Sequence, residues 1–223
     1  MKNIFGKVLV LTAGVALVAG AAAAPSMCDA EAGNIVTNCG FEGGVYTDGS
    51  GVSVPNGWTA NAGFDLNPGF NHVTNSPINS GGSALSIGNY TYQAAPVLSQ
   101  ILSDTAGNVY NGSVWVEYGG GFGAASYNGD PPAFLDLQVN GGNLLALNND
   151  STPGNTYTEF TFAFVATGSD TLALTGNTDP SEWFVDDVTI TNGGPAGQVP
   201  EPASLWLAGV SLLALGLARR KPL

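Results

Sequence analysis

The chain has 223 residues, including 32 glycines and 13 prolines, and 44% of its residues are hydrophobic while 10% are charged. This hydrophobic content is too high for a disordered chain, and the length allows one domain with a buried core. The formal net charge is -12, and residues 8–218 contain no lysine or arginine. Because nucleic-acid affinity depends on basic side chains that neutralise phosphates, this charge distribution excludes a nucleic-acid partner.

Residues 1–24 have the pattern of a secretory signal peptide. Lys2 and Lys7 precede an apolar run, and a series of alanines closes the segment. The run is shorter than the ~20 residues that a membrane span needs. We therefore expect signal peptidase to remove the segment during export, with a cut after Ala23, Ala24 or Ala30.

The body of the chain alternates apolar and polar residues in short segments. In residues 158–164, three phenylalanines occupy every second position, which is typical of a half-buried strand. Further segments rich in β-branched or aromatic residues and bounded by turn residues are 97–102, 109–116, 134–139, 144–147, 171–175 and 183–190. The pattern predicts an all-β fold, a jelly-roll β-sandwich, as one domain over residues 25–195.

Catalysis is the least favoured class of function. The only histidine, His72, lies in a polar segment where we expect a solvated surface position, and no nucleophile or zinc-protease motif occurs. The carboxylates that could act as a glycosidase acid and base have no recognisable spacing: Asp136, Glu117, Glu182 and Asp179. We therefore expect no catalytic residues.

The segment 196–223 combines three features in a fixed order. A triplet of Pro200, Glu201 and Pro202 precedes an apolar run over residues 203–218. As a helix, this run reaches about 24 Å, just enough to span a membrane. It is followed at once by a basic cluster, Arg219, Arg220 and Lys221. Since positive charges stay on the cytoplasmic side, the body is expected on the opposite side.

These three features resemble the PEP-CTERM sorting signal. The resemblance implies a Gram-negative bacterium in which an exosortase recognises the triplet and removes the transmembrane helix. The protein is then held only transiently in the inner membrane before it reaches the cell surface or an exopolysaccharide matrix. The C-terminal segment is an address, and the activity belongs to the body.

The body resembles the galactose-binding-like jelly-roll modules of carbohydrate-binding proteins. The resemblance rests on the opening segment 34–42, on Gly57 and Trp58, on residues 98–102, and on the closing segment 183–188 with its two aspartates. It implies the jelly-roll fold and an extracellular polysaccharide as partner. We therefore expect a noncatalytic carbohydrate-binding protein; a purely structural or adhesive biofilm protein without a discrete ligand site is the alternative.

The same resemblance implies a structural calcium ion. In such modules the glutamate of the opening motif and an aspartate of the closing strand hold calcium together, and these positions are Glu42 and Asp186. Strand alternation places Asp187 on one face and Asp186 on the core face, together with Phe184, Val188 and Ile190. The alternative is two ordinary carboxylates that accept backbone hydrogen bonds.

Cys28 and Cys39 are the only cysteines. In an exported, oxidising context we expect a disulfide that ties the mature N-terminus to the first strand. Free thiols and an intermolecular bridge are the alternatives.

The predicted sugar site lies on and after the strand 109–116. Tyr110, Val114 and Val116 share one face, which leaves Trp115 on the other as an exposed ring. Sugar sites pair such a ring with polar groups. The residues expected to complete the site are Tyr118, Phe122, Tyr127, Asn128 and Asp130. The alternative is that Trp115 packs in the core and the loop aromatics anchor a flexible segment.

Overall fold

The computed structural model describes residues 25–90, 92–120, 133–148, 154–177 and 181–197. In these ranges the chain forms two 3₁₀ helices and twelve strands: η1 (Cys28–Ala30), β1 (Val45–Thr47), β2 (Ser53–Pro55), β3 (Thr59–Ala60), η2 (Phe64–Leu66), β4 (His72–Thr74), β5 (Ala84–Ile87), β6 (Val97–Ile101), β7 (Asn108–Tyr118), β8 (Phe134–Val139), β9 (Gly142–Asn148), β10 (Thr158–Val165), β11 (Thr171–Gly176) and β12 (Trp183–Pro195). None of the described helices is long and apolar enough to cross a membrane. The predicted signal peptide and the apolar run 203–218 lie outside the described residues.

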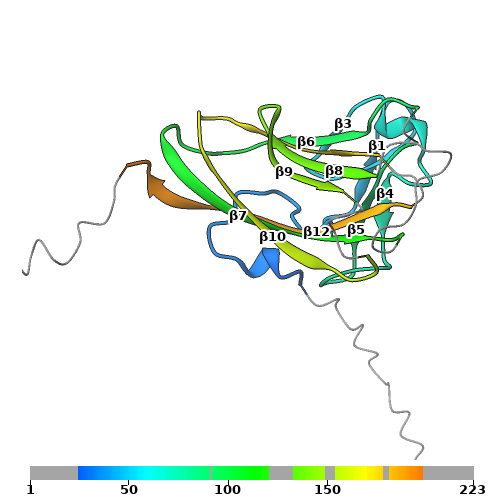
Figure 1. The fold of residues 1–223 in the computed structure, drawn as a ribbon, viewed down its shortest axis with the longest axis horizontal. Helices are drawn as coiled ribbons and strands as arrows, with labels where there is room; N and C mark the ends of the chain where they lie inside the picture. Colours follow the sequence, from blue (N-terminus) through cyan, green and yellow to red (C-terminus); the bar gives the residue numbers. More distant parts are fainter. Residues whose placement is uncertain (1–24, 91, 121–132, 149–153, 178–180, 198–223) are drawn as a thin grey trace, which may run out of the picture.

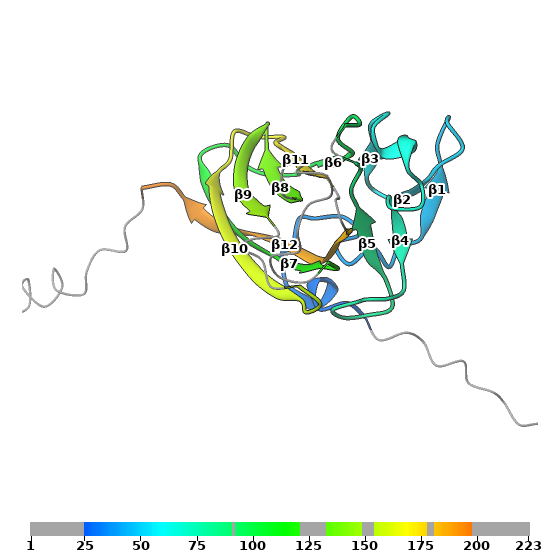
Figure 2. The ribbon, with the colours of Figure 1, turned by 45° about the vertical axis from the view of Figure 1, so that its right-hand side comes forward.

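Two five-stranded antiparallel sheets face each other, with strand orders β10-β7-β12-β5-β4 and β3-β6-β11-β8-β9 (Figures 1 and 2). The pairing is nested around the β8–β9 hairpin, because β7 pairs with β10, β6 with β11 and β5 with β12. Successive pairs alternate between the two sheets, which is the topology of a jelly roll. The predicted all-β sandwich is therefore confirmed.

All seven segments predicted as strands are strands, β6 to β12, and the largest difference is at the end of β12, which continues to Pro195. The sequence pattern does not reveal β1 to β5. These strands are two to four residues long. In strands this short, an alternation with a period of two cannot be recognised in the sequence. The positions of β1 to β5 are therefore known only from the structure.

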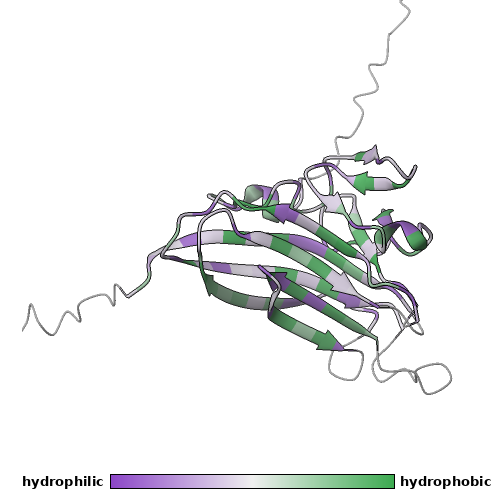
Figure 3. Ribbon diagram, turned by 90° about the horizontal axis from the view of Figure 1, so that it is seen from above, coloured by the Kyte–Doolittle hydropathy of each residue, from purple (hydrophilic) through white to green (hydrophobic). Residues whose placement is uncertain are grey.

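The core lies between the two sheets. Figure 3 shows the alternation of hydrophobic and hydrophilic residues along the strands, and in β8 this alternation buries Leu135 and Leu137. The largest fully buried side chains are Trp58 and Trp183. The Trp183 ring lies 4.7 Å from the ring of Tyr118, measured between centroids. Aromatic packing therefore closes the core where β12 begins.

The closing strand β12 contains a register shift that corrects one prediction. Asp186 pairs with Trp115 of β7, but the next paired residue is Thr189, opposite Ser113, so β12 has an extra residue there. Asp187 takes a positive φ of 47° at this bulge. The alternation of inward and outward side chains therefore changes phase at this bulge. The prediction that Asp186 shares the core face with Val188 and Ile190 is wrong. Asp187 does not point away into solvent either, because both aspartates are buried.

Candidate functional site

The predicted sugar site is only partly described by the structure. Trp115 lies on the face of β7 opposite the buried Val114 and Val116, as expected, but it is half-buried. Glu159 and Asp186 flank it on the neighbouring strands. Four predicted ligand residues lie outside the described residues: Phe122, Tyr127, Asn128 and Asp130.

The structure places Tyr118 in the core of the sandwich and not in the loop after β7, where the sequence pattern predicts it. Tyr118 is 0% exposed and packs against Trp183 in the core. It continues the alternation of Val114 and Val116, so it lies on the core face of β7. The strand extends two residues beyond its predicted end, and this extension brings Tyr118 into the sandwich instead of the loop.

Two of the predicted carboxylates, Glu117 and Asp136, do not form a glycosidase pair. Glu117 lies on β7 and Asp136 on β8, which belong to different sheets. Both point away from the core, since Tyr118 and Leu135 beside them are buried. Burial raises the pKa of each. Because the core separates them, they cannot act on opposite sides of one glycosidic bond, which needs carboxyl groups about 5–9.5 Å apart. Asp179 lies outside the described residues, and Glu182 directly precedes β12.

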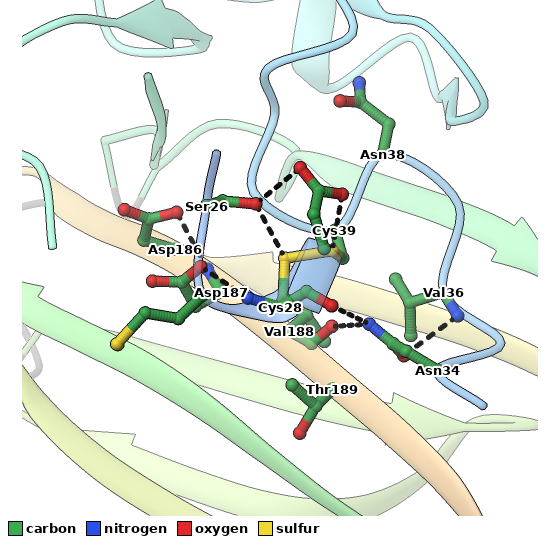
Figure 4. The surroundings of a disulfide bond; sticks show 12 residues. Ser26, Cys28, Asn34, Val36, Asn38, Cys39, Asp186, Asp187, Val188 and Thr189 are labelled. Atoms are coloured by element: carbon green, nitrogen blue, oxygen red, sulfur yellow. Dashed lines mark hydrogen bonds between the residues drawn. A yellow bond between two sulfur atoms is a disulfide. The ribbon is translucent and has the colours of Figure 1, made fainter. Parts of the chain in front are cut away.

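The N-terminal segment is fixed to the body by a disulfide between Cys28 and Cys39 (Figure 4). The backbone N–H of Cys28 also donates a hydrogen bond to Oδ1 of Asp187, at 3.1 Å. Met27 donates its N–H to Oγ of Ser80, at 2.8 Å. The two hydrogen bonds join residues that are more than 50 positions apart, and the one to Asp187 packs the start of the body on the closing strand β12.

Asp186 and Asp187 hold the segment 79–83 through hydrogen bonds. Oδ2 of Asp186 accepts the N–H groups of Asn79 (2.9 Å) and Ser80 (3.2 Å), while Oδ1 accepts the N–H of Asp187 (2.8 Å). Oδ2 of Asp187 accepts from Nδ2 of Asn79 and Oγ of Ser80. The two buried carboxylates thus accept hydrogen bonds from Asn79 and Ser80, from the N–H of Asp187 and from the N–H of Cys28, and need no cationic side chain.

Glu42 contacts the same segment from its other end. Its Oε1 accepts the N–H groups of Gly82 and Ser83, the latter at 2.8 Å. Gly81 lies between the residues that contact the aspartates and those that contact Glu42. Its φ is +66°, and a Cβ atom there would overlap Oε1 of Glu42. A glycine is required at this position for both reasons. The two residues of the predicted calcium pair, Glu42 and Asp186, therefore both bind the segment 79–83.

The described residues at this place do not fit a calcium ion. Calcium is bound by oxygen atoms, whereas the groups that face both oxygens of Asp186 and Oε1 of Glu42 are backbone N–H donors. In the described part of the chain, Glu42 and Asp186 belong to no group of three carboxylate, histidine or cysteine side chains close enough to share an ion. The geometry is that of carboxylates that accept hydrogen bonds, the alternative stated above.

The environment of Asp186 disfavours its charged form. Burial first, and then the neighbouring charge of Asp187, raise the pKa of Asp186 to about 7, although its hydrogen bonds with N–H groups oppose this. Burial also raises the pKa of Tyr157, with Asp186 and Glu117 as further causes. The hydroxyl of Tyr157 donates to the carbonyl of Pro77, at 3.2 Å. The segment around Pro77, which precedes residues 79–83, therefore covers the outer face of β12 at Asp186.

A polar surface pocket of about 440 Å³ lies next to Glu42. It is lined by carboxylates, amides, a hydroxyl and glycines: Asp29, Thr37, Asn38, Glu42, Gly43, Asn56 and Gly57. None of these described residues is aromatic. The pocket can form hydrogen bonds but offers no ring on which a sugar could stack.

Three aromatic rings gather on the surface between η2 and β4 and after β5. We call Phe70, Tyr90 and Tyr92 the aromatic platform. The rings of Tyr90 and Tyr92 are parallel within 3°, with centroids 5.5 Å apart, and Phe70 meets Tyr90 edge to face at 5.3 Å. Tyr92 is 80% exposed, the largest fraction for any large hydrophobic side chain in the described residues. One face of Tyr92 is thus held open to solvent while Tyr90 supports the other.

A buried carboxamide cluster fixes the loops under the aromatic platform. Asn89 is 0% exposed, and its Nδ2 donates to the carbonyls of Gly63 (2.6 Å) and Ala94 (2.8 Å). Its Oδ1 accepts from Nδ2 of Asn67 (3.1 Å) and of Asn71 (2.8 Å). A single side chain therefore joins both loops that carry the rings, so the platform is pre-organised.

Polar groups remain open beside the aromatic platform. Nδ2 of Asn67 also donates to Oε1 of Gln93, and the N–H of Gln93 donates to the carbonyl of Tyr90, at 2.9 Å. The other amide atoms, Nε2 of Gln93 and Oδ1 of Asn67, form no hydrogen bond with any described residue. A donor and an acceptor thus lie in the loops of the exposed ring, the combination that a sugar needs.

Sequence reasoning missed the aromatic platform. It searched for an exposed ring along a predicted strand, whereas Tyr90 and Tyr92 lie in a loop between β5 and β6. The available signal was a pair of tyrosines two positions apart between one asparagine and one glutamine, next to a strand too short to be recognised. Only the fold brings Phe70 to this pair.

Comparisons with known proteins agree with the C-terminal motif. The family model of the PEP-CTERM protein-sorting motif matches residues 198–221, which include Pro200, Glu201 and Pro202 and the basic cluster. The chain therefore carries a PEP-CTERM sorting motif. No curated protein matches the chain.

The body is similar to solved carbohydrate-binding modules. One is TmCBM61 in complex with beta-1,4-galactotriose, with 18% identity and a TM-score of 0.46 over 71% of this chain and 98% of that chain. Another is the CBM22-1 xylan-binding domain of Xyn10C from Paenibacillus barcinonensis, with 18% identity and a TM-score of 0.40 over 69% and 94%. A family 16 carbohydrate-binding module has 15% identity and a TM-score of 0.45 over 71% and 99%.

The hydrogen-bonded carboxylates predict that calcium does not stabilise the body. Melting in EDTA and in millimolar calcium is expected to give melting temperatures within about 2 °C of each other, because a ligand raises stability only through a site in the folded state. Differential scanning calorimetry measures this, with magnesium as the matched control. A rise of several degrees in calcium that Glu42→Gln and Asp186→Asn abolish would instead establish the calcium pair.

The raised pKa of Asp186 predicts a pH-dependent stability. The folded state favours the protonated carboxyl, so this group's contribution is complete below about pH 4 and is lost as pH rises to about 7. Asp186→Asn cannot ionise, so its stability relative to wild type should increase over this range. Urea unfolding of both proteins at pH 4.5 and pH 8 measures the difference. The assignment fails when that difference is the same at both pH values.

Proposed function

We propose that the chain is an exported, noncatalytic carbohydrate-binding protein whose ligand site is the aromatic platform. The observation that carries the proposal is the exposed, parallel stack of Tyr92 on Tyr90 beside open amide groups. Sugars have apolar C–H faces and polar edges, so a ring with neighbouring amides suits both parts of the molecule. The buried cluster around Asn89 supports this function because ordered loops lose little entropy on binding.

The competing function is a structural or adhesive matrix protein without a discrete ligand site. Such a protein would use exposed aromatic rings for contacts with many surfaces. The two proposals differ in one respect, since a discrete site is saturable and is competed by free sugar. Retention on a polysaccharide that free oligosaccharide reverses supports carbohydrate binding.

Export and sorting complete the proposal. Signal peptidase would cut before Ser26, because Ser26 and Cys28 are buried in the body and a cut after Ala30 would remove both. An exosortase would then recognise Pro200, Glu201 and Pro202 and remove the apolar helix 203–218. The resulting location is the cell surface or the extracellular polysaccharide matrix of a Gram-negative bacterium.

Replacing the exposed ring tests the ligand site. Tyr92→Ala should weaken binding to a neutral polysaccharide, such as β-1,4-galactan or xylan, by about fivefold, because one ring contact is worth about 1 kcal/mol. Its melting temperature should change by less than about 2 °C, since the side chain is exposed. Affinity electrophoresis measures the binding.

Two matched variants serve as controls for Tyr92→Ala. Ile101→Ala removes another exposed apolar side chain, 72% exposed, that lies away from the platform. Trp115→Ala removes the ring that the sequence favoured. Both should keep wild-type binding. Loss of binding in Trp115→Ala at an unchanged melting temperature, with binding retained in Tyr92→Ala, would move the ligand site to β7.

The sorting motif predicts the mass of the mature protein. In the native host, the exported form should lack Leu205 to Leu223, because the exosortase removes the apolar helix. Intact-mass spectrometry of exported protein measures this, and Glu201→Ala should retain the full tail. Wild-type protein shed into the medium with its complete C-terminal segment would contradict the sorting proposal.

A further inference from the structure

The chain leaves the body at one end of the sandwich. β12 runs from Trp183 to Pro195, and its last residues pair with the start of β7, where Pro195 lies opposite Asn108. Ala196 donates its N–H to the carbonyl of Gly107, at 2.8 Å. Only the residues 196–199 separate β12 from the sorting triplet. Seven residues, 196–202, separate β12 from the predicted membrane segment, and fully extended they reach about 25 Å, so the end of β12 lies near that segment before sorting.

The aromatic platform lies at the opposite end. β5 is antiparallel to β12, and Ile87, its last residue, pairs with Trp183, the first residue of β12. The chain that continues from Ile87 to Tyr90 therefore runs beyond the start of β12 and away from Pro195. β12 has 13 residues, which correspond to about 40 Å of strand. Figures 1 and 2 agree, because the end of β12 and the loops around η2 and β4 lie on opposite sides of the body.

We infer that the unprocessed chain, still anchored by its C-terminal segment, already binds polysaccharide and presents the aromatic platform away from the membrane. This inference rests on the proposed function of the platform. Because only seven residues separate β12 from the predicted membrane segment, the Pro195 end of the sandwich is the end nearest to the lipid surface, and a site at that end would be blocked. At the distal end, a polysaccharide chain can reach Tyr92 without meeting lipid headgroups. The precursor is thus a two-ended link between membrane and glycan.

The binding test compares one protein in two environments. The full chain is inserted with its body outward in phosphatidylcholine vesicles, and in parallel is kept in detergent micelles. Binding of β-1,4-galactan, xylan and other neutral polysaccharides is measured by co-flotation and by affinity electrophoresis. We expect the apparent dissociation constants in vesicles and in micelles to agree within about twofold, and the double variant Tyr90→Ala, Tyr92→Ala to lose binding in both.

The possible failures are distinguishable. Binding in micelles that is lost, or is more than tenfold weaker, in vesicles would overturn the orientation while the proposed function stands. Binding in neither environment would overturn the proposed function itself.

A distance measurement tests the orientation independently of any sugar. Single cysteines are introduced at Ala94, in the loop of the platform, and at Ala106, which is next to Gly107; both side chains are exposed, and the native cysteines are joined in the disulfide. A donor dye at each position is combined with an acceptor on the lipid headgroups. Energy transfer should be strong from position 106 and several-fold weaker from position 94. Equal or reversed transfer would contradict the proposed orientation.

Discussion

The absence of lysine and arginine from residues 8–218 is the constraint on which the rest of this structure depends. A buried carboxylate needs a partner, and because no lysine or arginine can provide one here, hydrogen-bond donors do. Asp186, Asp187 and Glu42 accordingly collect N–H and O–H groups from the segment 79–83 and from Cys28. The bulge of β12 and the packing of the N-terminal segment follow from this need. Buried carboxylates that accept hydrogen bonds therefore connect these segments to the body, in the place of ion pairs.

The same solution appears with neutral side chains under the aromatic platform. Asn89 satisfies two carbonyls and two amides and is completely buried. In both places buried polar side chains fix loops that have no regular secondary structure. This explains how a chain with 32 glycines and 13 prolines can hold exposed rings in a defined arrangement. The rigidity required of a binding site comes from buried polar contacts, and the hydrophobic core provides the frame.

The sequence predicts those strands in which apolar and polar residues alternate clearly. In β10 and β8 the alternation of phenylalanines and leucines identifies each strand almost to its ends. Alternation fails where one extra residue enters, because the bulge at Asp187 puts the residues before it out of phase with those after it. Val188 and Ile190 lie in the core as predicted, whereas Asp186 does not share their face, and no local signal marks the bulge. Tyr118 lies on the core face of β7 and not in the following loop for a related reason, since β7 continues past the point where the sequence pattern ends. The aromatic platform depends on contacts between distant loops, so the sequence could supply its residues but not their arrangement.

The central claim is that a sugar binds at the aromatic platform, and amide chemical-shift mapping tests it most directly. Isotope-labelled protein is titrated with a neutral oligosaccharide, and each backbone N–H signal is followed. Our account predicts that the largest shifts fall on residues 67–71 and 89–94, with saturation behaviour. Saturable shifts confined to β7 around Trp115, or to the polar pocket at Glu42, would contradict it, and so would unchanged signals throughout.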